Sequence, residues 1–279
     1  MRLVTFRTAG GTQAGRIDGA EVVGLDFPDV GALLASGPDW RQTASASGDA
    51  GATVARAEAD LAPLVVAPRK IICVGLNYAS HIQEMDRELP AYPTIFGKYA
   101  LSLIGARDPI VLPSVSDKVD WEVELAVVIG RPVRHADEST AREAIAGFTI
   151  LNDISVRDWQ NRTTQFLQGK TFEATTPLGP ELVTLDEIAD PDALAVRCEV
   201  DGEVMQSANT SDLLFGPVEL VRYLSAIITL EPGDIIATGT PGGVGAGRKP
   251  EVYLRTGQTV RTTIEGLGEL VNTCMEDER

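Results

Sequence analysis

The first part of the chain alternates short apolar runs with glycine-containing turns and polar stretches. Apolar runs at 3–6 and 22–25 predict a small β meander, and the apolar positions of 30–35 predict a helix after it. A stretch rich in Ala, Ser, Thr and Gly, 43–54, predicts a loop. That loop leads to a second helix, which we expect over 55–61 and which ends before two prolines that delimit a linker.

Beyond the linker the apolar runs become longer and read mainly as strands. The predicted strands cover 71–74, 123–129, 148–151, 194–200, 235–238 and 260–264. Only 139–146 and 218–228 predict helices, so strict βαβ alternation is missing and neither a doubly wound parallel sheet nor a TIM barrel is expected. The pattern indicates a β-rich α+β protein with a small N-terminal α/β domain at 1–65 and a catalytic domain at 69–279.

Composition and charge narrow the classes of partner. The 279 residues include 40 acidic and 24 basic side chains, a formal net charge of −16. This charge opposes binding to nucleic acid and to an anionic membrane surface. No run of about 18 apolar residues predicts a membrane span, and the first residues lack the apolar region of a signal peptide, so we expect a cytoplasmic protein. The three cysteines are far apart and form no CxxC motif, which favours buried, unreactive thiols.

An acidic pair precedes and enters the most apolar of the predicted strands. Glu122 and Glu124 are two residues apart, so in a strand their side chains point to the same face, while Val123, Leu125 and Val127 point to the other. Beyond Glu124 the acidic face continues with alanine and valine, where two neighbouring carboxylates repel unless they are neutralised. From this segment alone, a solvated edge strand and a metal site both remain open.

A third carboxylate favours the metal site. Asp153 directly follows the predicted strand 148–151 and therefore sits at a strand end. Three carboxylates in a chain with two histidines and no cysteine motif suit a hard, octahedral ion such as Mg²⁺ or Mn²⁺.

Three other features could be functional or could be ordinary parts of the protein surface. His81 precedes Glu84 by three residues, so one helical turn places imidazole and carboxylate side by side, as in a general base acting on water. An exposed helix pair would show the same spacing. Lys170 reads as a surface lysine unless it lies beside a metal. The glycine-rich stretch 239–247 is either a flexible turn or a loop whose N–H groups and Thr240 hydroxyl hold an anionic ligand.

Taken together, the motifs resemble those of the fumarylacetoacetate hydrolase family over residues 69–273. The matching segments, in the family's order, are Gly75-Leu-Asn-Tyr-Ala-Ser-His-Ile-Gln-Glu84, Trp121-Glu-Val-Glu-Leu125, Asn152-Asp153 with Arg157-Asp158 and Gln160, Gly169-Lys170, and Thr238-Gly-Thr-Pro-Gly-Gly-Val-Gly245. Five separated motifs in one order make the resemblance specific. It implies a mixed β-roll with peripheral helices, a role in the catabolism of aromatic compounds, and assembly as a homodimer.

The resemblance also implies the roles of the site residues. The metal ligands, for Mg²⁺ or Mn²⁺, would be Glu122, Glu124 and Asp153. The water-activating dyad would be His81 and Glu84, on a mobile segment that closes over the site. The substrate contacts would be Lys170, Arg157, Gln160 and Thr240. No matched position departs from the family's pattern.

These roles lead to a leading hypothesis and its competitors. We expect a metal-dependent hydrolase that cleaves a C–C bond of a 2,4-dioxo acid through an enolate stabilised by the metal and Lys170. In that reaction the His81–Glu84 pair deprotonates the attacking water. Oxaloacetate decarboxylation and 2-hydroxy-dienoate isomerisation at the same site are alternatives, as is a noncatalytic 2-oxo-acid binding protein. Arg87, within the predicted closing segment 85–92, is a candidate contact for a distal carboxylate of the substrate.

Overall fold

The computed structural model describes residues 1–46, 53–84 and 88–278, apart from the side chains of His81, Gln83 and Glu84. The strands are β1 (Arg2–Thr8), β2 (Gly11–Asp18), β3 (Glu21–Gly24), β4 (Thr53–Ala55), β5 (Ile71–Gly75), β6 (Thr94–Lys98), β7 (Leu103–Ile104), β8 (Ile110–Leu112), β9 (Val119–Asp120), β10 (Val123–Ile129), β11 (Ile145–Asn152), β12 (Ser155–Val156), β13 (Thr176–Thr184), β14 (Ala195–Val200), β15 (Glu203–Asn209), β16 (Ile235–Ala237), β17 (Thr259–Ile264) and β18 (Gly268–Glu276). The α-helices are α1 (Val30–Ala35), α2 (Trp40–Ala46), α3 (Ala79–Glu84), α4 (Glu138–Ala144), α5 (Arg157–Gln160), α6 (Leu167–Lys170) and α7 (Pro217–Ile227).

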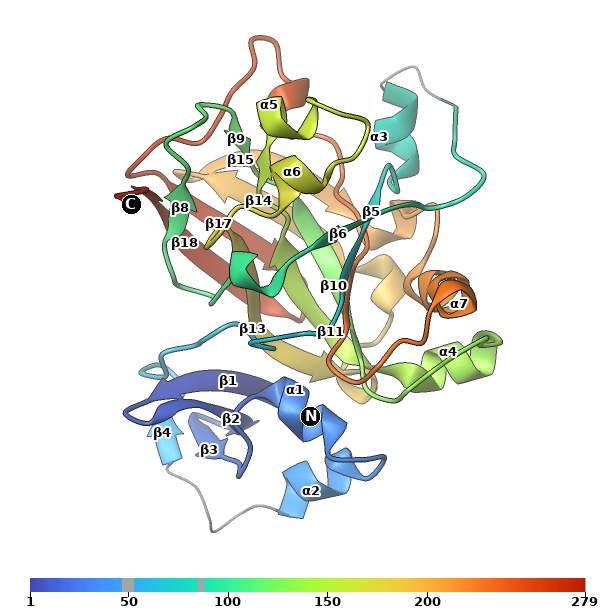
Figure 1. Cartoon of the computed structure of the whole chain (residues 1–279). Coiled ribbons are helices and arrows are strands. Elements are labelled where there is room, and N and C mark those ends of the chain that lie inside the picture. The colour runs from blue at the N-terminus through green and yellow to red at the C-terminus, as the bar shows by residue number, and fades with distance from the viewer. Residues whose placement is uncertain (47–52, 85–87, 279) are drawn as a thin grey trace.

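Two sheets form most of the molecule. The larger sheet has the order β4-β3-β2-β1-β13-β11-β10-β16-β5-β6, with β7 paired to β13, and the smaller sheet has the order β15-β14-β17-β18-β8. Most pairs are antiparallel, but β16 pairs with β5, β13 with β7 and β18 with β8 in parallel. Strands dominate and both sheets are mixed, so the expected β-rich α+β class is confirmed (Figure 1).

The apolar side chains of the central strand β10 are divided between two cores. On one face, Leu125 and Val127 join a core that includes residues of the smaller sheet and of α4 and α7. On the other face, Ala126 and Val128 join a core that includes α1 and α2. The alternation predicted for this strand is therefore confirmed, and the central strands are covered on both faces.

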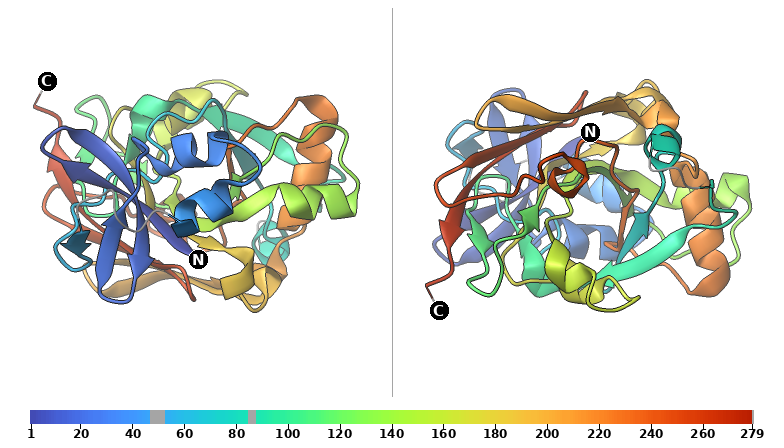
Figure 2. Two further views of the ribbon diagram at one scale, coloured as in Figure 1. Left: turned by 90° about the horizontal axis from the view of Figure 1, so that it is seen from below. Right: turned by 90° about the horizontal axis from the view of Figure 1, so that it is seen from above.

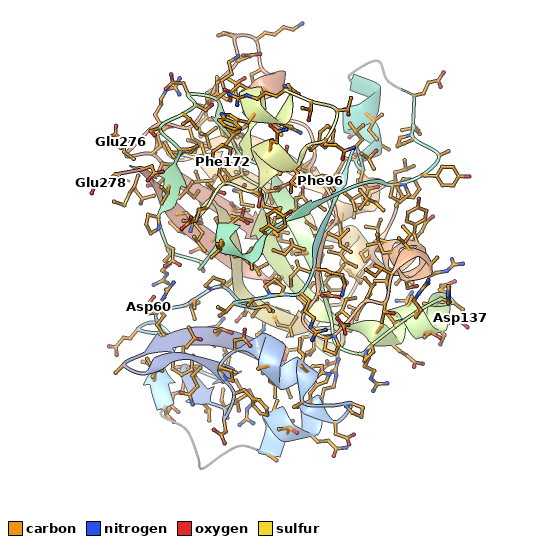
Figure 3. All side chains as sticks on the ribbon, in the orientation of Figure 1. Asp60, Phe96, Asp137, Phe172, Glu276 and Glu278 are labelled. Atoms are coloured by element: carbon orange, nitrogen blue, oxygen red, sulfur yellow. The ribbon has the colours of Figure 1, made fainter. Side chains whose placement is uncertain are left out.

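The N-terminal strands continue the larger sheet because β1 pairs with β13. Figures 1 and 2 show β1–β4, α1 and α2 gathered at one end of the molecule. At the junction, Arg7 forms ion pairs with Asp60 (2.8 Å) and with Asp108 (2.6 Å); Asp60 is labelled there in Figure 3. The division at 65–69 remains a prediction, since the N-terminal strands share a sheet and a core with the strands that follow.

Three predicted elements differ from the structure. The helix expected over 55–61 is wrong: after β4 there is one turn, and the backbone then pairs with β1, where the Arg7 N–H donates to the Asp60 carbonyl (2.7 Å). The loop expected over 43–54 is wrong at both ends, because 43–46 belong to α2 and 53–54 belong to β4. The helix expected over 139–146 ends at Ala144, because the residues that follow pair as β11 with both of its neighbours.

Candidate active site

The acidic pair lies at the entry of the central strand. β10 is hydrogen-bonded to β11 on one side and to β16 on the other, and all seven of its residues are buried. A solvated edge strand is thereby excluded. Glu122, just ahead of the strand, is 6% exposed, and Glu124, inside it, is 1% exposed.

Main-chain hydrogen bonds fix the third carboxylate beside the pair. Asp153 follows the last residue of β11, and its N–H donates to the carbonyl of Glu122 (2.9 Å). The Glu122 N–H donates to Oδ1 of Asn152 (2.9 Å), which ties the same two segments together. The result is a cluster in which Glu122, Glu124 and Asp153 each offer an oxygen within 4.8 Å of the other two.

Two buried lysines neutralise part of this charge. Lys170, at the end of α6, places Nζ 2.7 Å from Glu122 Oε2 and 2.7 Å from Asp153 Oδ2. Lys98, at the end of β6, places Nζ 2.6 Å from Asp153 Oδ1. Burial by itself would raise the pKa of Asp153, but the ammonium groups of Lys170 and Lys98 hold that pKa below its ordinary value.

Glu124 has no ammonium or guanidinium group in hydrogen-bond contact within the described part of the chain. Its Oε2 accepts a hydrogen bond from the N–H of Gly239 (2.7 Å). Burial, together with the negative charges of Asp153 and Glu122, raises the pKa of Glu124 well above its ordinary value. A divalent cation held by the three carboxylates would relieve this repulsion, so the donor set fits a hard metal ion.

Arg157 and Gln160, predicted as substrate contacts, lie together on the short helix α5. Arg157 forms ion pairs with Glu122 (2.7 Å) and with Asp120 (2.8 Å), and its Nη1 donates to Oε1 of Gln160 (2.9 Å). Burial alone would lower the pKa of Arg157, but the two carboxylates outweigh it and raise that pKa further.

The glycine-rich loop is attached to the acidic segment at both ends. Gly239 donates to Glu124, while the N–H groups of Gly245 (2.7 Å) and Ala246 (3.0 Å) donate to Asp120. The Thr240 hydroxyl accepts from Nε2 of Gln206 (2.8 Å), and Oε1 of Gln206 accepts from the N–H of Val123 (3.0 Å). These loop N–H groups bind the protein's own carboxylates, so the loop is a fixed wall of the site.

A cavity of about 510 Å³ opens onto these groups, a size common for small-molecule sites. Its lining includes Glu122, Glu124, Arg157, Gln160, Lys170 and Thr240. Apolar walls come from Phe96 and Phe166, whose rings meet edge-on with centroids 5.7 Å apart; Phe96 is labelled in Figure 3. An anionic head and a partly apolar tail would both find complementary surface in this cavity.

His81 and Glu84 lie on one helix, α3, as their spacing predicted, but their side chains are outside the described residues. The helix begins shortly after Val74, Gly75 and Leu76, which line the cavity. Arg87 lies outside the described residues altogether.

Sequence reasoning missed Lys98 and Asp120. Lys98 is 55 positions from Asp153 and ends an otherwise uncharged strand, so no local spacing connects the two. Asp120 is completely buried and accepts hydrogen bonds from Arg157 and the glycine-rich loop. Asp120 lies two residues before Glu122, which places both side chains on the same side of an extended segment, and this spacing could have predicted its place beside the site.

Comparisons with known proteins find relatives that cover most or all of the chain. Residues 70–275 match the family model described as Fumarylacetoacetate (FAA) hydrolase C-terminal. Oxaloacetate tautomerase Fahd2a, mitochondrial, of Rattus norvegicus is 50% identical over 213 residues, 76% of this chain and 68% of that protein. Oxaloacetate tautomerase fahd2, mitochondrial, of Xenopus laevis is 40% identical over 286 residues, 98% of this chain and 89% of that protein.

Solved structures share the fold over the whole chain. The fumarylacetoacetate hydrolase of Exiguobacterium antarcticum has a TM-score of 0.88 and 33% identity, covering 99% of this chain and 100% of that one. The 2-hydroxyhepta-2,4-diene-1,7-dioate isomerase of Mycobacterium marinum has a TM-score of 0.82 and 33% identity, with both chains fully covered. The maleylpyruvate hydrolase of Sphingobium sp. SYK-6, in complex with manganese(II) and pyruvate, has a TM-score of 0.82, 30% identity and full coverage of both chains.

The β-rich fold and these relatives define an enzyme with a small-molecule substrate. The chain belongs to the fumarylacetoacetate hydrolase family. The resemblance drawn from the sequence motifs is thereby confirmed, and the family's β-roll accounts for the mixed sheets described above. No helix among the described residues is long and apolar enough to cross a membrane.

Proposed function

We propose that the enzyme catalyses keto–enol chemistry on a 2-oxo acid and that tautomerisation of oxaloacetate is its first candidate reaction. The observation that carries the proposal is a cluster of three buried carboxylates, two of which, Glu122 and Glu124, line one cavity together with Lys170 and Arg157. Relatives of up to 50% identity named oxaloacetate tautomerase support the choice of substrate.

Glu122, Glu124 and Asp153 would hold the metal ion, which we propose to be Mg²⁺ or Mn²⁺. When bound there, such an ion supplies a Lewis acid that polarises the 2-oxo group of the substrate. Support comes from the carboxylate donor set and from the manganese(II) ion in the maleylpyruvate hydrolase complex.

The other cavity residues would bind and orient the substrate. Lys170 is held as an ammonium ion by Glu122 and Asp153, so it donates hydrogen bonds to negative charge that develops on the 2-oxo oxygen. Gln160 and the Thr240 hydroxyl line the same cavity and would bind the carboxylate beside the keto group. Arg157 would fix Gln160 and add positive charge. His81, oriented by Glu84, would move the proton at C3.

Hydrolysis of a 2,4-dioxo acid, the reaction expected from the sequence, is the second candidate. The His81–Glu84 pair would deprotonate a water that attacks the C4 carbonyl, and cleavage of C3–C4 would release a carboxylic acid and a pyruvate. Support comes from the placement of both residues on α3 and from the maleylpyruvate hydrolase relatives at about 30% identity. Decarboxylation and dienoate isomerisation would use the same enolate.

One panel of assays tests the proposed function. The Mg²⁺-loaded protein is given enol-oxaloacetate, an acylpyruvate and a 2-hydroxy-dienoate, while enol absorbance, pyruvate and CO₂ are followed. Tautomerisation removes the enol absorbance without releasing pyruvate, whereas hydrolysis and decarboxylation release it. His81→Ala is expected to lower the rate of whichever reaction the native protein catalyses by about 10²–10⁴-fold. Full activity in that variant would reject His81 as the base, and binding without turnover of any acid would favour a noncatalytic binding protein.

We also propose that the protein is a homodimer and that β6 contributes to the interface. β6 is an edge strand of the larger sheet, and exposed apolar side chains lie along it and just after it. They include Ile95 (37% exposed), Tyr99 (62%) and Leu101 (75%). Light scattering would report a dimer for the native chain and a monomer for the double variant Leu101→Glu, Tyr99→Glu.

The cytoplasmic location remains a prediction, since the relatives with a location in their names are mitochondrial.

A further inference from the structure

Arg248 lines the same cavity as the acidic cluster but differs from the other cations there. Its Nη2 donates to the carbonyl of Met205 (3.0 Å), and its guanidinium lies over the indole of Trp121, 6.0 Å from the ring centroid. Its Nε is buried and has no hydrogen-bond partner among the described residues. A buried donor without a partner costs free energy, and a ligand atom would satisfy it.

The cations that line the cavity differ in whether they have carboxylate partners. Lys170 pairs with two carboxylates, and Arg157 pairs with two. Arg248 has no ion pair with any carboxylate in the described part of the chain, although acidic residues outnumber basic ones in this protein. Among the described residues that line the cavity, Arg248 therefore carries a positive charge without a carboxylate partner, which a negatively charged ligand could supply.

Asp120, the carboxylate that binds the glycine-rich loop, does not supply this negative charge. Asp120, which binds the glycine-rich loop two and three positions before Arg248, already accepts from Trp121, Arg157, Gly245 and Ala246. The loop runs from Gly239, bonded to Glu124, to this Asp120 attachment. Arg248 thus follows the loop end that is bonded to Asp120, and it lines the same cavity as Glu122 and Glu124.

We infer that Arg248 binds the second carboxylate of a 2-oxo dicarboxylic acid and so determines specificity for dicarboxylates. The inference rests on the proposed function, because it takes the head of the 2-oxo acid to lie at the acidic cluster. A carboxylate accepts charge-assisted hydrogen bonds from a guanidinium, whereas a methyl group at the same place leaves the guanidinium desolvated and unpaired.

Matched ligand pairs test this role by binding instead of turnover. Oxaloacetate and 2-oxobutanoate differ only by a carboxylate in place of a methyl group, as do 2-oxoglutarate and 2-oxopentanoate. Isothermal titration of the Mg²⁺-loaded protein is expected to show the dicarboxylate of at least one pair binding about tenfold or more tightly than its partner. Arg248→Gln should abolish that preference and leave the affinity for the monocarboxylate within about twofold, while Arg248→Lys retains part of it.

Two further variants make the result specific. Arg255→Gln removes the same charge from an exposed arginine whose Nη1 bonds only backbone carbonyls, and it should keep the preference. Arg87→Gln tests the candidate taken from the sequence. Loss of preference in Arg87→Gln but not in Arg248→Gln would overturn the inference, as would an equal loss of affinity for both ligands of a pair in Arg248→Gln. A native protein that binds none of the four acids would instead reject the proposed function.

Discussion

Lys98 donates a hydrogen bond to Oδ1 of Asp153 across 2.6 Å, and both side chains are completely excluded from solvent. The other oxygen of Asp153 accepts from Lys170. We predict that Lys98→Met lowers the free energy of unfolding by about 3–5 kcal/mol, because it leaves a buried carboxylate oxygen without a partner. Urea denaturation in the absence of divalent metal measures the loss.

The matched control is Lys70→Met, which removes another lysine–aspartate pair. Lys70 is partly exposed, and its partner Asp234 would still accept hydrogen bonds from the backbone N–H groups of Lys70 and Glu231. A smaller loss is therefore expected for Lys70→Met. Equal losses in the two variants would contradict the special dependence of Asp153 on Lys98.

Glu124 allows a test of metal binding in which two readouts move in opposite directions. Without metal, Glu124→Gln removes a carboxyl group whose ionised form is disfavoured by burial and by Asp153 and Glu122, and the amide oxygen can still accept from Gly239, so stability should be unchanged or higher. With metal, the variant should lose the stabilisation that the native protein gains, about 2.7 kcal/mol at a hundred times the dissociation constant. Thermal unfolding with EDTA, Mg²⁺ or Mn²⁺ measures both.

A buried glutamate away from the cluster serves as its control. Glu181 is 2% exposed and pairs with Arg2 and Arg56. Glu181→Gln is expected to lower stability and to leave the metal-dependent shift intact. If EDTA and Mn²⁺ give the native protein the same melting temperature, the metal site is rejected.

The cysteines allow a prediction about alkaline pH. Cys73, Cys198 and Cys274 are all buried, as the sequence predicted, and burial raises the pKa of each, that of Cys274 to about 12. Because the folded state favours the neutral thiol, this contribution to stability is complete below the pKa of an unfolded thiol, roughly 8.5, and is lost as the pH rises from there toward 12. Ellman's reagent at pH 8 should detect no thiol in the native protein and three in urea, and Cys274→Ala should weaken the alkaline loss of stability. Rapid native labelling would contradict the burial.

Strand periodicity was enough to find the acidic cluster. The two-residue spacing placed Glu122 and Glu124 on one face, and the position of Asp153 after an apolar run placed it at a strand end. Both inferences depend on local geometry, which the sequence carries directly. The sequence could not show that the same face receives Lys98, because that contact depends on the pairing of β5 with β6 and with β16.

Elements defined by their partners were harder to predict. The strand β13 contains two prolines and a glycine with a positive φ, so its sequence does not read as a strand, yet it pairs with β1, β7 and β11. The segment 55–61 has helical composition, but its first residue pairs with β3 and its last two residues pair with β1. In both places tertiary pairing outweighs local preference.

Gly239 joins the glycine-rich loop to Glu124 in a conformation that other residues rarely adopt. Its φ is +104°, and an added Cβ would lie 2.9 Å from both the Val74 carbonyl oxygen and the Asn77 Cβ, which belongs to a fully buried, hydrogen-bonded side chain. Gly239→Ala is therefore expected to cost more than the roughly 1–2 kcal/mol of the backbone conformation alone, and to weaken metal binding by displacing the N–H that fixes Glu124. Gly257→Ala, with a φ of +85° and open space around the new methyl group, isolates the conformational cost. Urea denaturation measures the stability of the two variants, and Mn²⁺ titration measures their metal affinity. Equal stability losses together with equal metal affinities would mean that the loop does not position Glu124.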